Sequence, residues 1–259
     1  MTVKDFELAG KRALVTGGGD GLGVQMTQAL VDAGAKVYIC GRRDEVLQRT
    51  VKQIKASDGV DVTAIIADVT KPEDIDKLKN EIGELDILVN NAGVSHRAHW
   101  RDVKSEDWRY IMTINVESPF WLFQKFAPGM IDRGWGRVIN IASIYGLVAG
   151  DESKYPGFGL DIVSYFASKH GLIGLTKFLA AQVATTGVTV NNVCPGMFNS
   201  PVNESVLTKE VISELNGGTP MNRMGADGEL RTAILYLAAK NSGFVTGQNI
   251  VVDGGWTIW

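Results

Sequence analysis

Cysteine is scarce in this chain, which has two such residues, Cys40 and Cys194, among 259. The two lie far apart in strand-like apolar runs, and neither belongs to a CxxC pair. The sequence therefore predicts buried thiols in a reducing compartment. A chain of this length buries enough apolar surface to fold without disulfides or metal ions, so a small disulfide-rich scaffold is excluded and no metal is expected.

Long apolar runs and an excess of one charge are also missing. No stretch approaches the ~18 apolar residues of a membrane span. The opening MTVKDFELAGKRALVTG lacks the apolar core of a targeting signal. The 26 Lys and Arg against 29 Asp and Glu give a net charge of -3, which argues against a nucleic-acid groove or an anionic membrane surface. We therefore expect a cytoplasmic protein whose partners are small molecules.

Glycine is abundant, at 30 residues, and suggests many tight turns. Longer helical patterns alternate with seven short β-rich runs: RALVTG, AKVYIC, VTAIIADV, DILVNNAG, RVINIAS, VTVNNVCPG and NIVVDGG. Because these runs are nearly continuous in apolar residues, they suit a parallel sheet buried on both faces, with helices in right-handed crossovers. No repeat or Pro/Ser-rich boundary divides the chain. The sequence thus predicts one α/β domain over residues 1–259, with a doubly wound sheet of seven strands.

Local sequence signals indicate where two helices begin, and two segments interrupt the alternation of strands and helices. Pro72 stands at the first turn of PEDIDKLKNEI, and Asp227 is a possible cap before GELRTAILYLAA. Residues 150–162 and 200–218 adjoin strand ends. Ligands of open α/β sheets bind outside the carboxyl ends of the strands, so both segments are placed to contact substrate. The alternative is that they are ordinary surface excursions.

A glycine-rich turn follows the first strand and leads directly into a helical pattern. Gly17, Gly21 and Gly23 follow the spacing GxxxGxG and not GxGxxG, and Val24 stands where a P-loop needs lysine. Such glycines let the backbone approach a pyrophosphate, and the helix amino terminus offers N–H groups and a positive dipole end. The turn predicts a phosphate-binding site; the alternative is a plain tight turn.

Tyr165 and Lys169 are four residues apart, so they meet on one helical face. An ordinary tyrosine has a pKa near ~10. A neighbouring positive charge favours the phenolate, and proton transfer works best when the pKa lies near the operating pH. The pair therefore looks like an acid/base site, although tyrosine and lysine also meet at this spacing by chance. Tyr145 and Tyr155 have no lysine four residues later.

Further short motifs accompany this pair in order along the chain. They are Asp68-Val69 after the third strand, Asn90 to Gly93 after the fourth, Asn115, Ser143 after the fifth, and Pro195-Gly196 after the sixth. Together with the glycine turn and the YxxxK pair, they make nearly the whole chain similar to the short-chain dehydrogenase/reductase family. The resemblance implies a Rossmann-type fold of three layers, αβα. It also implies NAD(P)-dependent hydride transfer between nicotinamide and a secondary alcohol or ketone.

The resemblance also implies the catalytic roles. Tyr165 would exchange a proton with the ketone oxygen, and Lys169 would depress the tyrosine pKa and bind the nicotinamide ribose. Ser143 would polarise the carbonyl, and Asn115 would hold a water that links Lys169 to solvent. On the residues alone, Ser143 is equally a strand-end turn serine, and Asn115 a buried helix asparagine bonded to backbone.

The cofactor contacts that the resemblance implies follow the strand ends. Asp68 would accept a hydrogen bond from the adenine amino group, or else serve only as a turn or capping residue. Pro195-Gly196 would hold the nicotinamide edge, or form only a strand-ending turn. The implied cofactor-binding residues are Gly17, Gly21, Leu22, Gly23, Arg42, Asp68, Val69, Asn91, Ala92, Gly93, Tyr165, Lys169, Pro195, Gly196 and Ser200.

The end of the second strand bears on the choice of dinucleotide. NAD-dependent relatives usually place an aspartate there, whereas this chain has Gly41 followed by Arg42. Arg42 could pair with a 2'-phosphate, which favours NADP(H) over NAD(H). Asp20 in the glycine turn argues the other way, because its charge would repel that phosphate. Arg43 is expected to be a solvated charge at a helix start.

Substrate contacts are expected from His96, Ser143, Tyr155 and Met197. Arg97 and His99 could also reach substrate, although His96 is better placed. The alternative for His96 is exposed loop polarity. Ser143 and Tyr165 are 22 positions apart, more than is usual in the family, because residues 150–162 are extra. A loop insertion costs little closure entropy, so the site can survive it.

Flanking segments give the only hint of substrate. The opening FELAGKRALVTG, NRMG at 222–225 and the ending VDGGW resemble members that act on gluconate-type sugar acids and polyols, and also 3-oxoacyl-carrier-protein reductases. We expect a sugar acid or polyol first and an oxoacyl thioester second. A cofactor-binding sensor without turnover is the alternative of another class. The family implies a homotetramer or homodimer, and Trp256 and Trp259 would suit an interface.

Overall fold

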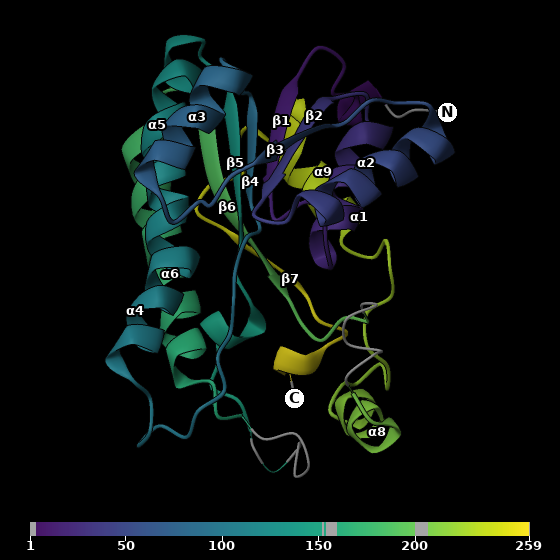
Figure 1. Ribbon diagram of the computed structural model, residues 1–259, viewed down its shortest axis with the longest axis vertical. Coiled ribbons are helices and arrows are strands. Elements are labelled where there is room, and N and C mark those ends of the chain that lie inside the picture. Colours follow the sequence, from purple (N-terminus) through teal and green to yellow (C-terminus); the bar gives the residue numbers. More distant parts are fainter. Residues whose placement is uncertain (1–3, 152, 154–159, 200–206, 259) are drawn as a thin grey trace.

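A single parallel sheet runs through the computed structural model, which describes residues 4–151, 153, 160–199 and 207–258 (Figure 1). Its strands lie in the order β3-β2-β1-β4-β5-β6-β7, and every neighbouring pair is parallel. The strands are β1 Arg12–Thr16, β2 Lys36–Gly41, β3 Thr63–Ile66, β4 Ile87–Asn90, β5 Gly136–Ile141, β6 Val188–Pro195 and β7 Asn249–Val252. Each predicted β-rich run therefore forms a strand, and the expected doubly wound sheet of seven strands is confirmed.

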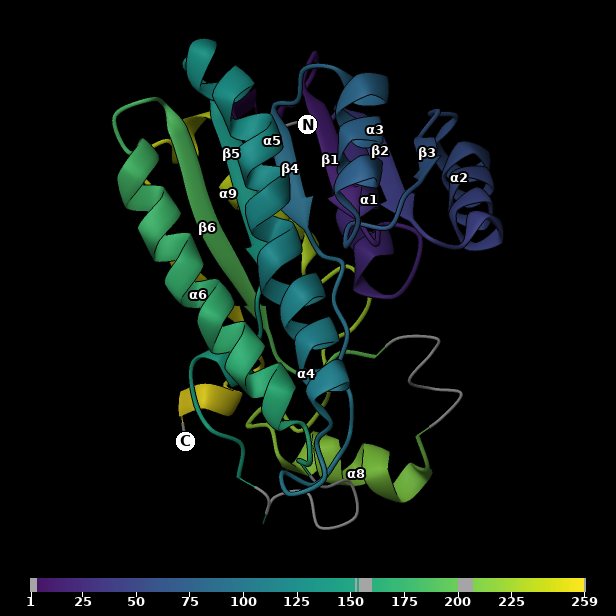
Figure 2. The same ribbon diagram turned by 60° about the vertical axis from the view of Figure 1, so that its left-hand side comes forward.

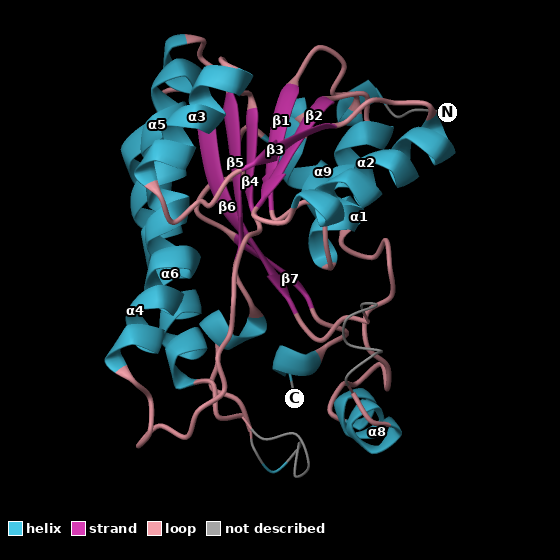
Figure 3. Ribbon diagram, in the orientation of Figure 1, coloured by secondary structure: helices cyan, strands magenta, loops and turns pink. Residues whose placement is uncertain are grey.

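Helices cover both faces of this sheet (Figures 2 and 3). Helices α1, α2 and α9 pack into one hydrophobic cluster, and α3, α5 and α6 pack into a second one on the other face. The central strands are buried on both sides, and β4 and β6 are buried at every position, which explains why these runs are nearly continuous in apolar residues. The helices are α1 Leu22–Asp32, α2 Asp44–Asp58, α3 Pro72–Ile82, α4 Ser105–Met112, α5 Ser118–Asp132, α6 Val163–Val183, α8 Lys209–Gly217 and α9 Arg231–Ala238.

Local sequence signals predicted one helix start correctly and one wrongly. Pro72 is the first residue of α3, as expected. Asp227 does not cap α9, which begins at Arg231. The N–H groups of Gly228 and Leu230 donate instead to Oε1 of the buried Gln25 on α1, at 3.1 and 3.0 Å. A side chain distant in sequence thus satisfies these donors, and no local pattern reveals such a partner.

A chain of buried polar side chains crosses the sheet. The Asn90 amide donates to Asn140 Oδ1, and the Asn140 amide donates to Thr176 Oγ1 on α6. Thr176 Oγ1 donates in turn to Asn192 Oδ1, and the Asn192 amide donates to Asn249 Oδ1. Each of these four hydrogen bonds is 2.8 Å long. They join β4, β5, β6 and β7 to α6, the helix that carries the YxxxK pair.

The structure describes only parts of residues 150–162 and 200–218, the two segments that interrupt the alternation of strands and helices. Residues 152, 154–159 and 200–206 lie outside the described part of the chain, whereas Lys209–Gly217 forms α8 at the end of the molecule toward which the strands run (Figure 3). Among the helices described, none combines the length and the apolar character needed to cross a membrane.

Candidate active site and nucleotide cleft

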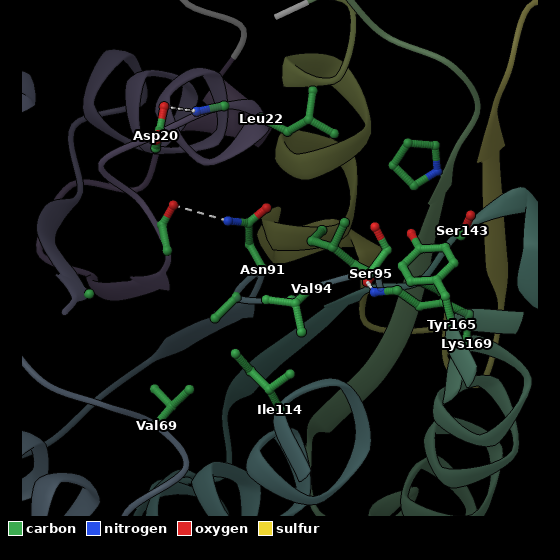
Figure 4. Close-up of a pocket in the computed structure, with 18 of the residues that line it drawn as sticks. Asp20, Leu22, Val69, Asn91, Val94, Ser95, Ile114, Ser143, Tyr165 and Lys169 are labelled. Carbon is green, nitrogen blue, oxygen red and sulfur yellow. Dashed lines mark hydrogen bonds between the residues drawn. The ribbon is translucent and has the colours of Figure 1, made fainter. Parts of the chain in front are cut away.

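A cavity of about 700 Å³ opens at the carboxyl ends of the strands. Residues that follow β1 to β6 line it, because parallel strands all end at the same edge of the sheet. The cavity lies where strand order switches between β1 and β4, the place at which doubly wound sheets bind ligands. In Figure 4, Asp20 and Val69 lie toward one end of it, and Ser143, Tyr165 and Lys169 lie together at the other.

The glycine turn is built for close approach of the backbone. Gly17 has a φ of 64°, in the left-handed region that favours glycine. A Cβ on Gly23 would lie 2.2 Å from the Gly17 carbonyl oxygen, so no side chain fits there. The Asn91 amide donates to the carbonyl oxygens of Thr16 and Gly17, at 2.9 and 3.1 Å, and braces the turn. The turn presents the start of α1 to the cavity, as a pyrophosphate-binding turn requires.

Opposite charges meet beside this turn. Arg43 Nη2 lies 2.8 Å from Asp20 Oδ2, and both side chains are partly solvent-exposed. Arg43 stands at the start of α2 as expected, but it is paired and not simply solvated. The negative charge of Asp20, which would repel a 2'-phosphate, is therefore compensated by the Arg43 guanidinium. Arg42 also lines the cavity, and its Nη1 donates to the Tyr110 hydroxyl at 2.9 Å.

The predicted adenine contacts line the same cavity. Asp68 and Val69 follow β3, and both are lining residues together with Ile114. Asp68 Oδ1 accepts hydrogen bonds from the Thr70 N–H and hydroxyl, at 3.1 and 2.7 Å. One carboxylate oxygen thus closes a turn, as the alternative interpretation proposed, while the side chain remains at the cavity wall.

Ser143 and Tyr165 meet at the other end of the cleft. Ser143 lies two residues after the end of β5 and caps a short 3-10 helix, Ile144–Gly146, where its Oγ accepts from the Tyr145 N–H at 3.1 Å. The hydroxyl proton of Ser143 is not used in that bond and can donate elsewhere. Figure 4 shows the Ser143 and Tyr165 side chains next to each other at this end of the cavity, and Ser143 acts to lower the pKa of Tyr165. The structure thus brings together the two hydroxyls that the sequence motifs singled out.

Lys169 lies beneath them and is 5% exposed. Its Nζ donates to the Ile141 carbonyl oxygen at 2.7 Å and lies 5.4 Å from the centre of the Tyr165 ring. Burial lowers the pKa of Lys169 from 10.5 to about 8. Burial also raises the pKa of Tyr165, and the Ser143 hydrogen bond only opposes that rise. The expected depression of the tyrosine pKa is thus not found, because desolvation by burial is the largest effect on Tyr165 and raises its pKa.

Asn115 joins three segments around this pair. It lies in a π-helical turn, Thr113–Glu117, between α4 and α5. Its Oδ1 accepts from the Val94 N–H, and its amide donates to the Val94 carbonyl oxygen and to Ser168 Oγ, each at 2.9 Å. Ser168 Oγ donates to the Tyr165 carbonyl oxygen at 2.8 Å. Asn115 is therefore bonded largely to backbone. Ser168 was not singled out from the sequence, because its role depends on a partner 53 residues away.

At the substrate end of the cavity, the loop after β4 contributes different lining residues from the one expected. Ser95 and Arg97 line the cavity, whereas the exposed His96 between them is not among its lining residues. Met197 lines the cavity as expected, beside Ile144 and Ile162. The other wall residues that follow strand ends are Ala92, Gly93, Pro195 and Gly196. Tyr155 and Ser200 fall outside the described residues.

Two further expectations concern buried side chains. Cys40 and Cys194 are free, buried thiols as predicted, and burial raises their pKa values to about 12 and about 11. Trp256 is not available for an interface, because it is 5% exposed and packs edge-on against the Tyr145 ring at 5.6 Å. That pairing buries the indole inside this chain; Trp259 falls outside the described residues.

Comparison with known proteins agrees with this geometry. The family model for short chain dehydrogenase matches residues 11–211. The chain is 35% identical to D-beta-hydroxybutyrate dehydrogenase of Rhizobium meliloti, over 95% of this chain and 98% of that protein. It is 34% identical to gluconate 5-dehydrogenase of Gluconobacter oxydans, over 98% and 97%.

A solved structure shares the architecture as well. The gluconate 5-dehydrogenase from Burkholderia cenocepacia, in complex with NADP and tartrate, superimposes with a TM-score of 0.86 at 34% identity, covering 98% of this chain and 97% of that one. Sequence, site geometry and fold lead to the same conclusion: the chain belongs to the short-chain dehydrogenase/reductase family.

Proposed function

We propose that this oxidoreductase interconverts a secondary alcohol and a ketone on a sugar acid or polyol, with NADP(H) as the preferred cofactor. In this proposal residues 1–259 form one catalytic domain, and Asn115, Ser143, Tyr165 and Lys169 serve the reaction. The observation that carries the proposal is the meeting of the Ser143 and Tyr165 hydroxyls above the buried Lys169, at one end of a nucleotide-sized cleft.

The cleft fits a dinucleotide. Its volume of about 700 Å³ lies within the usual range of ligand sites, about 300–1,000 Å³. The glycine turn would hold the pyrophosphate, Asp68 and Val69 the adenine, and the residues after β4 and β6 the nicotinamide half. When bound, the nicotinamide supplies or accepts the hydride, while the protein provides orientation and electrostatics. Ser200 is included among the proposed cofactor-binding residues only because of its position in the sequence motif.

The side chains of this chain handle the proton. In reduction Tyr165 gives its proton to the ketone oxygen, toward which Ser143 directs its own hydroxyl proton. Both contacts strengthen as negative charge develops on that oxygen. The Lys169 ammonium then stabilises the phenolate that remains, and in oxidation Tyr165 takes the proton back. Asn115 keeps the loop after β4 against α6, which holds Tyr165 and Lys169 in register.

The charged residues at the end of β2 support a preference for NADP(H) over NAD(H). Arg42 lines the cavity, and Asp20, which would repel a 2'-phosphate, is paired with Arg43. An arginine can bind a phosphate through two parallel N–H groups, which gives geometric specificity as well as affinity. The charge balance around the ribose therefore favours the phosphorylated cofactor.

The residues that line the cavity favour a substrate with a negative charge. Arg97 and Ser95 line it, and an arginine is suited to bind a carboxylate. The similar gluconate 5-dehydrogenase from Burkholderia cenocepacia forms a complex with tartrate, a hydroxy acid. The apolar neighbours Ile144, Ile162 and Met197 favour the second candidate, a 3-oxoacyl thioester, whose chain is less polar.

Assembly and location belong to the same proposal. The long helix α6 exposes Phe178 to 62%, which would suit a contact with a second copy in a homodimer or homotetramer. The two free, buried cysteines fit a cytoplasmic location, where thiols stay reduced.

NADPH oxidation with a panel of ketones tests the function. The panel contains keto sugar acids, neutral ketoses and a 3-oxoacyl thioester, and turnover of the first group is expected to be fastest. Tyr165→Phe should lower kcat by about 10²- to 10⁴-fold, the usual contribution of general acid catalysis. Tyr236→Phe, at an exposed tyrosine on α9, should leave it unchanged.

Two results would oppose the proposal in different ways. Equal turnover by Tyr165→Phe and wild type would show that the proton donor is misassigned. Tight NADPH binding without turnover of any ketone would favour the cofactor-binding sensor instead.

A further inference from the structure

Arg42 has a partner that no sequence pattern predicts. Its Nη1 donates to the hydroxyl of Tyr110, 68 residues later, at 2.9 Å. Arg42 directly follows β2, whereas Tyr110 lies on α4, the helix that leads to the π-helical turn holding Asn115. The bond therefore joins the two elements on either side of the adenosine end of the cleft.

Tyr110 stands behind the cavity wall. Ile114, one helical turn later, is a lining residue together with Val69, and Figure 4 shows both on the same side of the cavity. Tyr110 is not among the lining residues, whereas Arg42 is. Tyr110 is thus placed to hold the Arg42 guanidinium in position from outside, without taking up space in the nucleotide site.

The chemistry of the partner matters, because a phenol orients a cation without neutralising it. The neighbouring Arg43 is paired with the Asp20 carboxylate at 2.8 Å, so its charge is already compensated. Within the described residues, Arg42 forms no ion pair. Its charge therefore remains available to an anion in the cleft. The phenol accepts the Arg42 hydrogen bond and carries no charge of its own, so it leaves the charge of the guanidinium unpaired.

We propose that Tyr110 is a positioning residue that aims the Arg42 guanidinium at the 2'-phosphate of the cofactor and so contributes to selection of NADPH over NADH. This inference rests on the NADP(H) preference proposed above. The restraint reduces the side-chain freedom that Arg42 loses on binding, since a pre-organised group costs less entropy when the ligand arrives. The effect is confined to the phosphorylated ribose, because Tyr110 does not line the rest of the site.

Binding measurements on the complete protein test the role of Tyr110. Dissociation constants for NADPH, NADH, adenosine 2',5'-bisphosphate and adenosine 5'-monophosphate would be measured for wild type, Tyr110→Phe, Arg42→Met and the double variant. The phenylalanine keeps the ring and removes only the hydroxyl. Tyr236→Phe is the matched control, because Tyr236 is exposed to the same 41% on the remote helix α9.

The expected result is a selective loss. Tyr110→Phe should weaken binding of NADPH and of the bisphosphate about three- to tenfold, as for the loss of one ordinary hydrogen bond, and leave binding of NADH and of the monophosphate unchanged. Arg42→Met should weaken the same two ligands more strongly. The double variant should be no weaker than Arg42→Met, because both changes remove one coupled interaction.

The remaining outcomes overturn the inference and separate it from the proposed function. If Arg42→Met is selective but Tyr110→Phe is not, the NADP(H) preference stands and the role of Tyr110 fails. An equal loss for NADH and NADPH in Tyr110→Phe would show a merely structural role. If wild type binds NADH as tightly as NADPH, the cofactor preference fails, and the role of Tyr110 fails with it.

Discussion

Burial, more than charge, sets the protonation of the two central residues. Tyr165 has a raised pKa and Lys169 a lowered one, because both charged forms lose hydration inside the protein. At neutral pH the site therefore holds a neutral phenol beside an ammonium that is close to losing its proton. That state suits donation of a proton to a ketone oxygen, the reduction direction.

The pKa of Lys169 gives a pH dependence with a definite sign. A lysine whose pKa is about 8 and not 10.5 loses its charge as pH rises through about 8. The ammonium that binds ribose and stabilises the phenolate is then missing from the free enzyme. We expect kcat/KM for NADPH, which reports the free enzyme, to be level below that pH and to fall above it.

Lys169→Arg provides the control, because a guanidinium keeps its charge throughout this range. The variant should be slower at neutral pH, since the guanidinium is larger, but its profile should not fall near pH 8. A descending limb at the same pH in both proteins would assign the titration to another group.

The family resemblance carried by short motifs singled out the candidate reacting groups but not their surroundings. Ser143 and Tyr165 were recognisable because the end of a buried strand and a helical spacing of four leave each little freedom of position. The direction of the Tyr165 pKa shift was not predictable, because desolvation depends on packing from several elements. The Arg42–Tyr110 bond and the position of Arg97, rather than His96, at the cavity wall depend on loop and helix placement that short patterns do not encode.

At the scale of elements, α6 is fixed to the sheet through Thr176. Its hydroxyl accepts from Asn140 and donates to Asn192, and all three residues are buried. This single group connects β5 and β6 with the helix that carries Tyr165 and Lys169. The polar chain therefore controls how the reacting side chains are placed over the strand ends.

Thr176→Val removes the hydroxyl while keeping the shape of the side chain. Two buried amides then lack a partner, at a cost of about 1–3 kcal/mol in the free energy of unfolding. For a chain of this size the melting temperature should fall by about 2–4 °C per kcal/mol. Thermal unfolding followed by circular dichroism measures the change.

Thr186→Val is the comparison, because Thr186 Oγ1 donates only to the Val183 carbonyl oxygen at the partly exposed end of α6. It should lower the melting temperature much less. Equal effects of the two substitutions would show that the polar chain adds nothing beyond an ordinary helix-end hydrogen bond.

Elements with a strong local pattern were the predictable ones. The strands of this sheet are short runs rich in apolar and β-branched residues, and Pro72 marks a helix start by its chemistry. The start of α9 was missed because Gln25 on α1 satisfies its N–H groups. The π-helical turn at Thr113–Glu117 was missed because its residues keep helical spacing on both sides.

At the scale of the whole molecule, the α5–α6 layer exposes two large aromatic side chains. Phe178 on α6 is 62% exposed and Phe120 on α5 is 37% exposed. The two helices lie side by side on one face of the molecule (Figure 2). A surface helix normally shows a polar outer face, whereas apolar residues on every side indicate burial against a partner. We therefore expect a second copy of this chain to cover this layer.

Phe178→Asp tests that expectation, because a carboxylate in an apolar contact must be desolvated without a partner. Wild type should show a mass in solution that is a multiple of 28.0 kDa, and the variant should shift toward the single chain, as measured by light scattering after size exclusion. Val60→Asp, on the loop before β3, changes an exposed valine far from α6 and should keep the wild-type mass. A wild-type protein that runs as a single chain, or a variant that keeps the full assembly, would show that the apolar layer is not the contact between copies.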